Sequence, residues 1–216
     1  MKRFLLLLGV AACTSKSGSD TPAPQPAATA LYRVTFEAAW SPATHPGNYP
    51  SGAHFSPLIG ASHRPDAESR LFAAGMLAGL GIKDMAERGD NRALRTEINA
   101  LIGQGRAFQL LDGRAAFNSP GTATDTLRLS LTHPAATVVT MVAPSPDWFA
   151  ALEAENLLGP DGWATTRRVP AIFYDAGTDS GPTYTAPDQP STPAEPVRTA
   201  MPGAAPFGYF VLERIK

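Results

Sequence analysis

Apolar and polar residues alternate along YRVTFEAAW, residues 32–40. A period of two is typical of a β-strand that turns one face toward a core. Strand patterns, either alternating or rich in β-branched residues, recur in four further stretches: 125–132, 137–143, 167–174 and 207–215. The last of these is apolar on both faces, so we expect it in the middle of a sheet. Pro170 favours a sheet edge or a bulge, because proline cannot donate a ladder hydrogen bond.

Helical spacing is confined to one connection, between the first strand and the later ones. It covers residues 66–80 and 90–102, and the second stretch places four apolar residues on one face: Leu94, Ile98, Leu101 and Ile102. Asp90 is the expected N-cap of that second helix, and Gly103 is its expected C-terminal stop. Strands therefore dominate, and the sequence predicts an all-β fold, an antiparallel β-sandwich with a helical insertion.

The N-terminus, MKRFLLLLGVAAC, has the form of a secretory signal. Lys2 and Arg3 precede a short apolar run that ends at Cys13, the only cysteine among the 216 residues. The residues VAAC resemble a bacterial lipobox, which predicts a signal peptide over residues 1–12 and a lipidated Cys13. An ordinary signal peptide with a chance cysteine is the alternative. A threonine after the cysteine, Thr14 in place of an aspartate, resembles the sequence of lipoproteins sent to the outer membrane. The face of that membrane on which the domain would lie stays open.

Residues 13–30 hold this cysteine and a Pro/Ser/Ala-rich stretch typical of a flexible tether, so we expect the folded domain to span residues 31–216. Without a second cysteine the domain has no disulfide, and a packed core, aided at most by a metal, must stabilise it. The chain has 18 Lys and Arg against 19 Asp and Glu residues and no basic cluster, which argues against nucleic acid as a partner. A second Pro-rich stretch, residues 182–206, predicts a long ordered loop, with disorder as the alternative.

Common catalytic motifs are missing from the sequence. The four histidines match no usual zinc-ligand spacing, and His45 and His54, which flank a Pro/Gly-rich turn, are expected to be turn or surface residues. The glycine-rich residues 75–81 lack the Lys-Ser/Thr of a phosphate loop and predict a helix end. No nucleophile elbow is present. We therefore assign no catalytic residue, although a dispersed triad would be recognised only by its geometry.

Three aspartates form the candidate site. Asp175 and Asp179 lie four positions apart in YDAGTDSG, and Asp147 follows the strand over residues 137–143. If neighbouring strands bring them to one rim of the sandwich, their like charges repel unless a cation lies between them. Oxygen ligands favour a hard divalent cation, calcium outside the cytoplasm, and Gly177 would permit the sharp turn. The alternatives are a basic side chain, solvent, or aspartates that cap turns through local hydrogen bonds.

Three long stretches, residues 32–63, 141–149 (MVAPSPDWF) and 174–197 (YDAGTDSGPTYTAPDQPSTPAEPV), resemble the spondin N-terminal domain. The resemblance runs in order over nearly the whole folded region and implies a C2-like β-sandwich of the extracellular matrix that binds calcium at one end. The family's metal-binding aspartates lie in its PSPDW and DAGTDSG motifs, which match Asp147, Asp175 and Asp179. Matrix members of the family attach the domain to thrombospondin-type repeats, so their partners do not transfer to this chain.

Together these features predict a lipid-anchored, calcium-binding spondin-type module for recognition or adhesion at the cell envelope. The lipid on Cys13 would hold it on the membrane, and its ligand would be a glycan, lipid or protein surface; the oligomeric state stays open. The alternatives are a metal-assisted envelope hydrolase and a structural lipoprotein in which calcium only holds the fold. Carboxylates without a nearby poised base favour binding over catalysis. Trp148, beside Asp147, is expected to pack inward, with an aromatic face beside the ion as the alternative.

Overall fold

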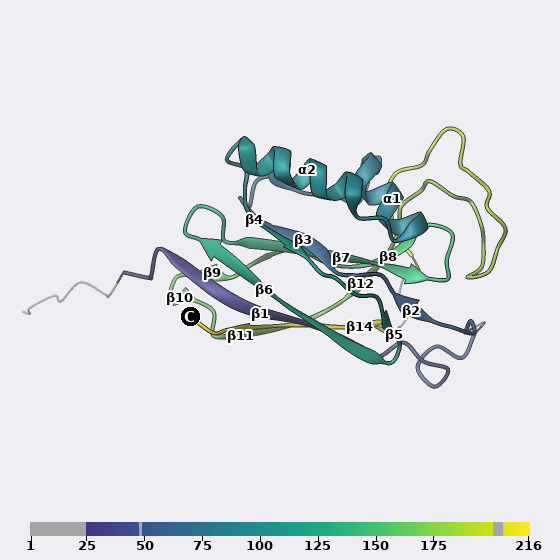
Figure 1. The fold of residues 1–216 in the computed structure, drawn as a ribbon, viewed down its shortest axis with the longest axis horizontal. Coiled ribbons are helices and arrows are strands. Elements are labelled where there is room, and N and C mark those ends of the chain that lie inside the picture. Colours follow the sequence, from purple (N-terminus) through teal and green to yellow (C-terminus); the bar gives the residue numbers. More distant parts are fainter. Residues whose placement is uncertain (1–24, 48, 201–204) are drawn as a thin grey trace, which may run out of the picture.

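The computed structural model describes residues 25–47, 49–200 and 205–216. Two antiparallel sheets pack face to face, and two helices lie over the outer face of the larger sheet (Figure 1). The beginning of the described chain and the C-terminus lie at the same end of the sandwich, where the N–H of Leu31 donates to the carbonyl of Lys216 at 2.8 Å. The predicted all-β sandwich with a helical insertion is confirmed.

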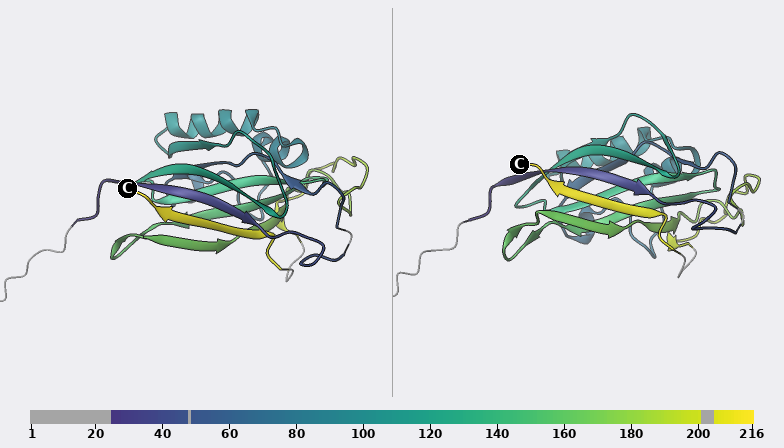
Figure 2. Two further views of the ribbon diagram at one scale, coloured as in Figure 1. Left: turned by 60° about the horizontal axis from the view of Figure 1, so that its bottom comes forward. Right: turned by 90° about the horizontal axis from the view of Figure 1, so that it is seen from below.

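The smaller sheet has the strand order β11-β14-β1-β6 and faces the viewer in the right-hand view of Figure 2. Its members are β1 (Thr29–Ala38), β6 (Gly121–Ser130), β11 (Thr166–Pro170) and β14 (Gly208–Arg214). Strand β1 begins two residues before the expected start of the folded domain at residue 31. The signal peptide over residues 1–12 and Cys13 lie outside the described residues.

The larger sheet has the order β13-β12-β8-β7-β2-β5, and β3 pairs with both β7 and β4. Its members are β2 (His54–Phe55), β3 (Ile59–His63), β4 (Ala107–Asp112), β5 (Phe117–Asn118), β7 (Ala135–Ala143), β8 (Trp148–Asn156), β12 (Ile172–Asp175) and β13 (Arg198–Thr199). A separate small hairpin contains β9 (Leu158–Gly159) and β10 (Gly162–Trp163). The helices are a short 3-10 helix (Ala67–Ser69), α1 (Leu80–Arg88) and α2 (Arg92–Gly103).

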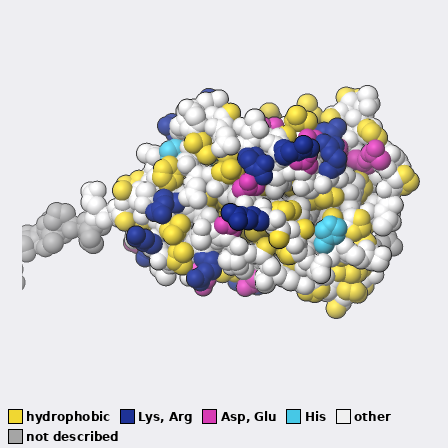
Figure 3. Space-filling model, viewed as in Figure 1, with side chains coloured by type: hydrophobic (Ala, Val, Ile, Leu, Met, Phe, Trp, Pro, Cys, Tyr) yellow, Lys and Arg dark blue, Asp and Glu magenta, His cyan; other side chains and the backbone are white. Residues whose placement is uncertain are grey.

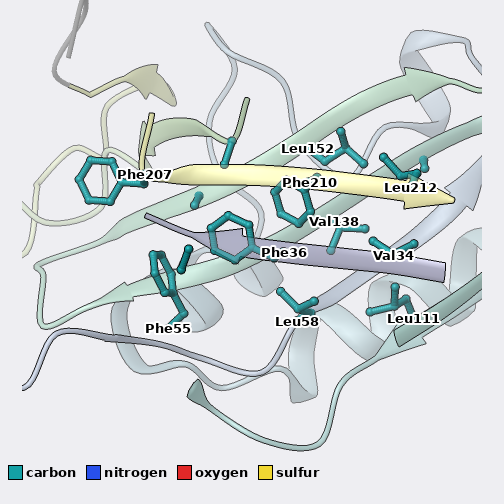
Figure 4. Close-up of a cluster of buried hydrophobic side chains, with 14 of the residues drawn as sticks. Val34, Phe36, Phe55, Leu58, Leu111, Val138, Leu152, Phe207, Phe210 and Leu212 are labelled. Carbon is teal, nitrogen blue, oxygen red and sulfur yellow. The ribbon is translucent and has the colours of Figure 1, made fainter. Parts of the chain in front are cut away.

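Alternate residues of β1 form one wall of the core between the sheets. Tyr32, Val34 and Phe36 are fully buried, as their alternation predicts. Phe36 stacks on Phe210 of β14 with 4.7 Å between ring centroids, and it meets Phe55 of the larger sheet edge-on at 5.0 Å. Figure 4 shows these rings among aliphatic side chains from both sheets. Strand β14 lies between β11 and β1, which confirms its predicted central position.

A second core fills the space between the helices and the outer face of the larger sheet. Its helical side consists of Ile82 and Met85 from α1 and of Leu94 and Ile98 from α2, all fully buried. Strand β7 is therefore covered on both faces. This explains why residues 135–143 are apolar at most positions instead of at alternate ones.

The predicted helix over residues 66–80 is wrong. Only the 3-10 helix lies there, and α1 begins at Leu80, where the predicted helix has its end. Gly75 has a φ of +85°, in the left-handed region that favours glycine. A Cβ on Gly81 would lie 2.6 Å from the Cα of Leu94, so the two helices approach closely at this glycine. The glycine-rich residues therefore precede and open a helix instead of ending one.

The predicted helix over residues 90–102 is confirmed as α2, with a different N-cap. Asn91 occupies the N-cap position and makes no capping bond through its side chain. Asp90 lies one residue earlier, and its Oδ1 accepts a hydrogen bond from the N–H of Arg92 at 3.0 Å. Asp90 thus satisfies a free donor of the first turn from outside the helix.

The stretch over residues 167–174 forms two strands instead of one. β11 ends at Pro170 on the edge of the smaller sheet, which confirms the edge position of this proline. β12 begins at Ile172 in the larger sheet, so the chain crosses from one sheet to the other around Ala171. The strand predicted over residues 125–132 also starts earlier than expected and ends at Ser130, as β6.

Candidate functional site

Two neighbouring strands bring Asp147 and Asp175 to the same end of the larger sheet. Asp147 immediately precedes β8, and Asp175 is the last residue of β12. The two strands are antiparallel, with Asp175 opposite Trp148, and the N–H of Ala176 donates to the backbone carbonyl of Asp147 at 3.1 Å. The arrangement of strands expected from the sequence is therefore present. We call Asp147, Asp175 and Asp179 the aspartate rim.

Asp147 connects β8 to the turn that follows β12. Its side chain is fully buried, and its Oδ2 accepts hydrogen bonds from the N–H groups of Thr178 at 2.7 Å and Asp179 at 3.0 Å. The hydroxyl of Thr178 also lies 3.3 Å from this oxygen. The other oxygen, Oδ1, is buried and has no hydrogen-bond partner among the described residues. A buried charged oxygen without a partner is costly, because it has lost its hydration without compensation.

The environment of Asp147 disfavours its charged form. Burial, and to a smaller extent the nearby negative charge of Asp175, raise the pKa of Asp147 to about 6, against the opposing effect of the N–H donors of Thr178 and Asp179. Near neutral pH the carboxyl group is therefore mostly ionised, at an energetic cost. Either a proton or a cation at Oδ1 would relieve this cost.

Asp175 and Asp179 each cap a turn. Asp175 Oδ1 accepts from the N–H of Gly177 at 2.8 Å, and Asp179 Oδ1 accepts from the N–H of Gly181 at 2.7 Å, both two residues along the chain. The remaining oxygen of Asp179 accepts from the N–H of Gln189 at 2.8 Å. The turn-capping alternative is thus part of the structure.

A basic side chain also binds the aspartate rim. Arg198 of β13 lies opposite Asp175, and its Nη2 donates to Asp175 Oδ2 at 2.8 Å. Nothing in the sequence around Arg198 predicts this contact, because the two partners lie 23 positions apart. Thr178, by contrast, lies inside YDAGTDSG, and its position between the two aspartates is the signal that could have identified it.

Gly177 allows the turn to pass close to the long loop. Its φ is +74°, and a Cβ at this position would lie 2.2 Å from the carbonyl oxygen of Glu195. The N–H of Glu195 in turn donates to the carbonyl of Gly177 at 2.8 Å. The predicted sharp turn at Gly177 is confirmed, and it holds the loop against the aspartate rim.

The long Pro-rich loop leads from residue 182 into β13, while residues 201–204 of the stretch lie outside the described part of the chain. Its Tyr184 is buried and packs against Trp148 and Trp40, with ring centroids 5.0 and 5.2 Å apart. Figure 1 shows the loop extending beyond the end of the sandwich, next to α1. Trp148 itself packs inward, as expected, and is not an aromatic surface beside the rim.

A small cavity of about 230 Å³ adjoins the aspartate rim. Asp179 lines it together with Glu87 and Arg88 of α1, Ser145 before β8, and Asp188 of the loop. Arg88 is bound to Asp84 at 2.5 Å and to Glu87 at 3.4 Å. A larger cavity of about 590 Å³ lies elsewhere, between β4, β5 and β6.

Within the described ranges, no three His, Cys, Asp or Glu side chains are gathered so that they could hold a metal ion as they stand. The three aspartates are neighbours, but most of their oxygens point at N–H groups or at Arg198. The exception is Asp147 Oδ1. Its need for a positive partner, and the carboxylate chemistry around it, fit a hard cation such as calcium.

The histidines each bind a nearby backbone carbonyl. His54 is half-buried at the start of β2 instead of in a turn, and its Nδ1 lies 2.8 Å from the carbonyl oxygen of Gly52. His45 lies in a turn but is buried, with Nε2 2.9 Å from the carbonyl of Ala205. His63 is fully buried, and burial lowers its pKa. It contacts the hydroxyl of Thr137 at 2.8 Å, which indicates a structural role.

Charges of both signs are interspersed on the side of the molecule seen in Figure 3, where Lys and Arg side chains lie next to Asp and Glu side chains. The helices form ion pairs of this kind, such as Lys83 with Glu87 at 3.7 Å and Arg95 with Asp112 at 2.7 Å. No helix in the described part of the chain is long and apolar enough to cross a membrane.

Comparison with known proteins gives a consistent match. The family model described as Spondin_N matches residues 30–207. Spondin-1 from Homo sapiens is 37% identical over 182 residues, which cover 79% of this chain and 22% of that protein. Spondin-2 from Homo sapiens is 32% identical over 200 residues, covering 88% of this chain and 58% of that protein. This chain therefore spans less than two thirds of the length of these relatives.

Proposed function

The chain belongs to the spondin N-terminal domain family, and on this premise we propose that it is a recognition or adhesion module whose aspartate rim binds calcium. The observation that carries the proposal is the buried, unpartnered Oδ1 of Asp147. Asp147, Asp175 and Asp179 would hold the ion. The module would act outside the cytoplasm, at the cell envelope, on a glycan, lipid or protein surface.

The donor chemistry supports calcium in particular. Calcium binds about 6–8 oxygen ligands in flexible geometry, so three carboxylates leave positions for water or for oxygens of a ligand. Asp175 and Asp179 already accept N–H bonds, but a carboxylate oxygen has a second lone pair to offer. A bound cation would also offset the repulsion between the neighbouring charges of Asp147 and Asp175. The ion would supply charge and open oxygen positions for recognition.

We assign no catalytic residue. The rim contains carboxylates, N–H donors and one arginine, and the histidine contacts are structural, so no poised base accompanies the proposed ion. This favours binding over a metal-assisted hydrolase. A structural lipoprotein in which calcium only holds the fold is the second candidate, favoured by the turn-capping bonds of Asp175 and Asp179.

Attachment to a surface separates these two candidates. We expect protein that begins at residue 25 to bind envelope glycans or lipids in the presence of calcium. In chelator its affinity for them should fall at least about tenfold, because binding of the ion and binding of the ligand would be coupled. This starting point keeps the carbonyl of Ala27, which accepts from Trp163 Nε1 at 2.8 Å. Binding is measured by glycan and lipid arrays, with circular dichroism to confirm the fold in both buffers.

Asp147→Asn should abolish the calcium-dependent binding while the fold survives. Asparagine keeps an oxygen for the N–H groups of Thr178 and Asp179, whereas alanine would leave both without an acceptor. Asp161→Asn, on an exposed aspartate, is the charge-matched control and should bind like wild type. Equal surface binding in calcium and chelator would instead make calcium a purely structural ion.

Lipid anchorage is a separate part of the proposal and rests on the VAAC motif. We expect wild type to partition into the detergent phase, and Cys13→Ser to be released or mis-processed, because stable anchoring needs more than one acyl chain. Phase partitioning and mass spectrometry of the mature N-terminus measure this. An unmodified N-terminus at another residue would contradict the anchor without affecting the calcium site.

A further inference from the structure

Arg198 holds a position that a bound cation would also take. Its Nη2 lies 2.8 Å from Asp175 Oδ2, and its Nη1 contacts the carboxylate of Glu195. Asp175 and Arg198 face each other in the β12–β13 pairing, so the contact follows from strand register. The Asp175 side chain is only 12% exposed, whereas that of Arg198 is 49% exposed. The arginine therefore reaches a buried carboxylate from the solvent side.

This arginine is the basic side chain that directly contacts the aspartate rim in the described residues. The neighbouring Arg88, across the small cavity, is bound to Asp84 and Glu87 instead. Without Arg198, Asp175 would add an unpaired negative charge beside the buried Asp147. Like charges at this distance destabilise each other, so Arg198 stabilises the rim when no metal is bound.

We propose that Arg198 is an internal counter-cation that competes with calcium for Asp175 and thereby sets the calcium affinity of the site. This inference rests on the proposed calcium binding. A divalent ion on Asp175 places two further positive charges beside the guanidinium, and the two cations repel each other. Calcium entry therefore requires Arg198 to leave Asp175.

The exposure of Arg198 makes such an exchange feasible. Solvent reaches the guanidinium side of this ion pair and weakens it, and the long side chain loses freedom to form it. After release, the guanidinium keeps Glu195 as a partner and stays near the solvent. The competition therefore weakens calcium binding without preventing it, and Arg198 acts as a positioning residue that tunes affinity.

The test is the calcium dissociation constant of the full-length chain, measured by isothermal titration calorimetry for wild type and Arg198→Gln. Competition predicts that Arg198→Gln binds calcium at least about tenfold more tightly, within the usual range for coupled sites. It also predicts a lower melting temperature than wild type in chelator, since Asp175 is then unpaired. A merely structural role predicts the opposite sign, because a loosened loop would weaken calcium binding.

Two further variants sharpen the result. Arg198→Lys keeps the charge and should return the dissociation constant toward the wild-type value. Arg95→Gln removes an arginine of similar exposure, bound to Asp112 at 2.7 Å away from the rim, and should leave calcium affinity unchanged. Circular dichroism of each variant confirms that it is folded.

The possible outcomes distinguish the role of Arg198 from the proposed calcium binding by the aspartate rim. Unchanged or weaker calcium binding by Arg198→Gln, with binding by wild type, would overturn the role of Arg198 and leave the calcium site standing. Calcium binding by Arg198→Gln but not by wild type would support competition strong enough to prevent measurable binding in wild type. No calcium binding by either protein would overturn both.

Discussion

We expect calcium to raise the melting temperature of this domain at neutral pH, and Asp147→Asn to remove most of that rise. The reason is linkage: an ion that binds only the folded state stabilises it by about 2.7 kcal/mol at a hundredfold excess over the dissociation constant. For a domain of this size that corresponds to about 5–10 °C. Differential scanning calorimetry in chelator and in millimolar calcium measures the effect. Asp175→Asn and Asp179→Asn should reduce the rise as well.

Magnesium distinguishes a calcium site from general charge screening. Magnesium demands regular octahedral geometry and gives up its waters reluctantly, so it should change the melting temperature little. Asp161→Asn, on an exposed residue, should retain the full response to calcium. An identical melt with and without millimolar calcium would leave Asp175 and Asp179 as turn caps and Arg198 as the cation of the rim.

The sequence predicted the strands that have one face on a core, because burial then follows the alternation. Residues 32–40 show this most clearly, with alternate residues of β1 buried against β14 and the larger sheet. The pattern was uninformative for β3, which is buried at all five positions and reads as IGASH. A strand covered on both faces has no alternation, and small residues such as Gly60 leave little apolar signal.

The predicted helix over residues 66–80 failed because apolar spacing does not guarantee a buried face. Met76 and Leu77 are 65% and 63% exposed, so they supply no core contact that would hold a helix together. The chain at this point pairs with the long loop, where Leu77 bridges to Pro196. That partner lies more than a hundred residues away and leaves no local signal.

The aspartate rim was predictable in part. The strand-end positions of Asp147 and Asp175 and the glycine at 177 pointed to one end of the sandwich. Two facts depend on tertiary structure and could not be predicted: the complete burial of Asp147, and the pairing of Asp175 with Arg198. The first accompanies the turn after β12, whose Thr178 and Asp179 bind Asp147, and the second results from the register between β12 and β13.

In chelator, the metal-free protein should lose stability as the pH rises from about 4 through about 6. Burial raises the pKa of Asp147 from its ordinary value of 3.8 to about 6 in the folded state. Between these values the folded state binds more protons than the unfolded state, so stability falls with increasing pH and levels off above the folded pKa. The difference corresponds to about 3 kcal/mol as an upper estimate.

Asp147→Asn should remove this loss, because an amide carries no charge to bury. The free energy of unfolding of this variant, from urea titrations in chelator, should match wild type near pH 4 and exceed it by up to about 3 kcal/mol near pH 8. Asp161→Asn should follow the wild-type profile. The same substitution should thus stabilise the metal-free protein at high pH, because it removes a buried charge, and abolish its response to calcium, because it removes a charged ligand. A variant that is less stable than wild type throughout this pH range would mean that Asp147 acts chiefly through its hydrogen bonds to Thr178 and Asp179.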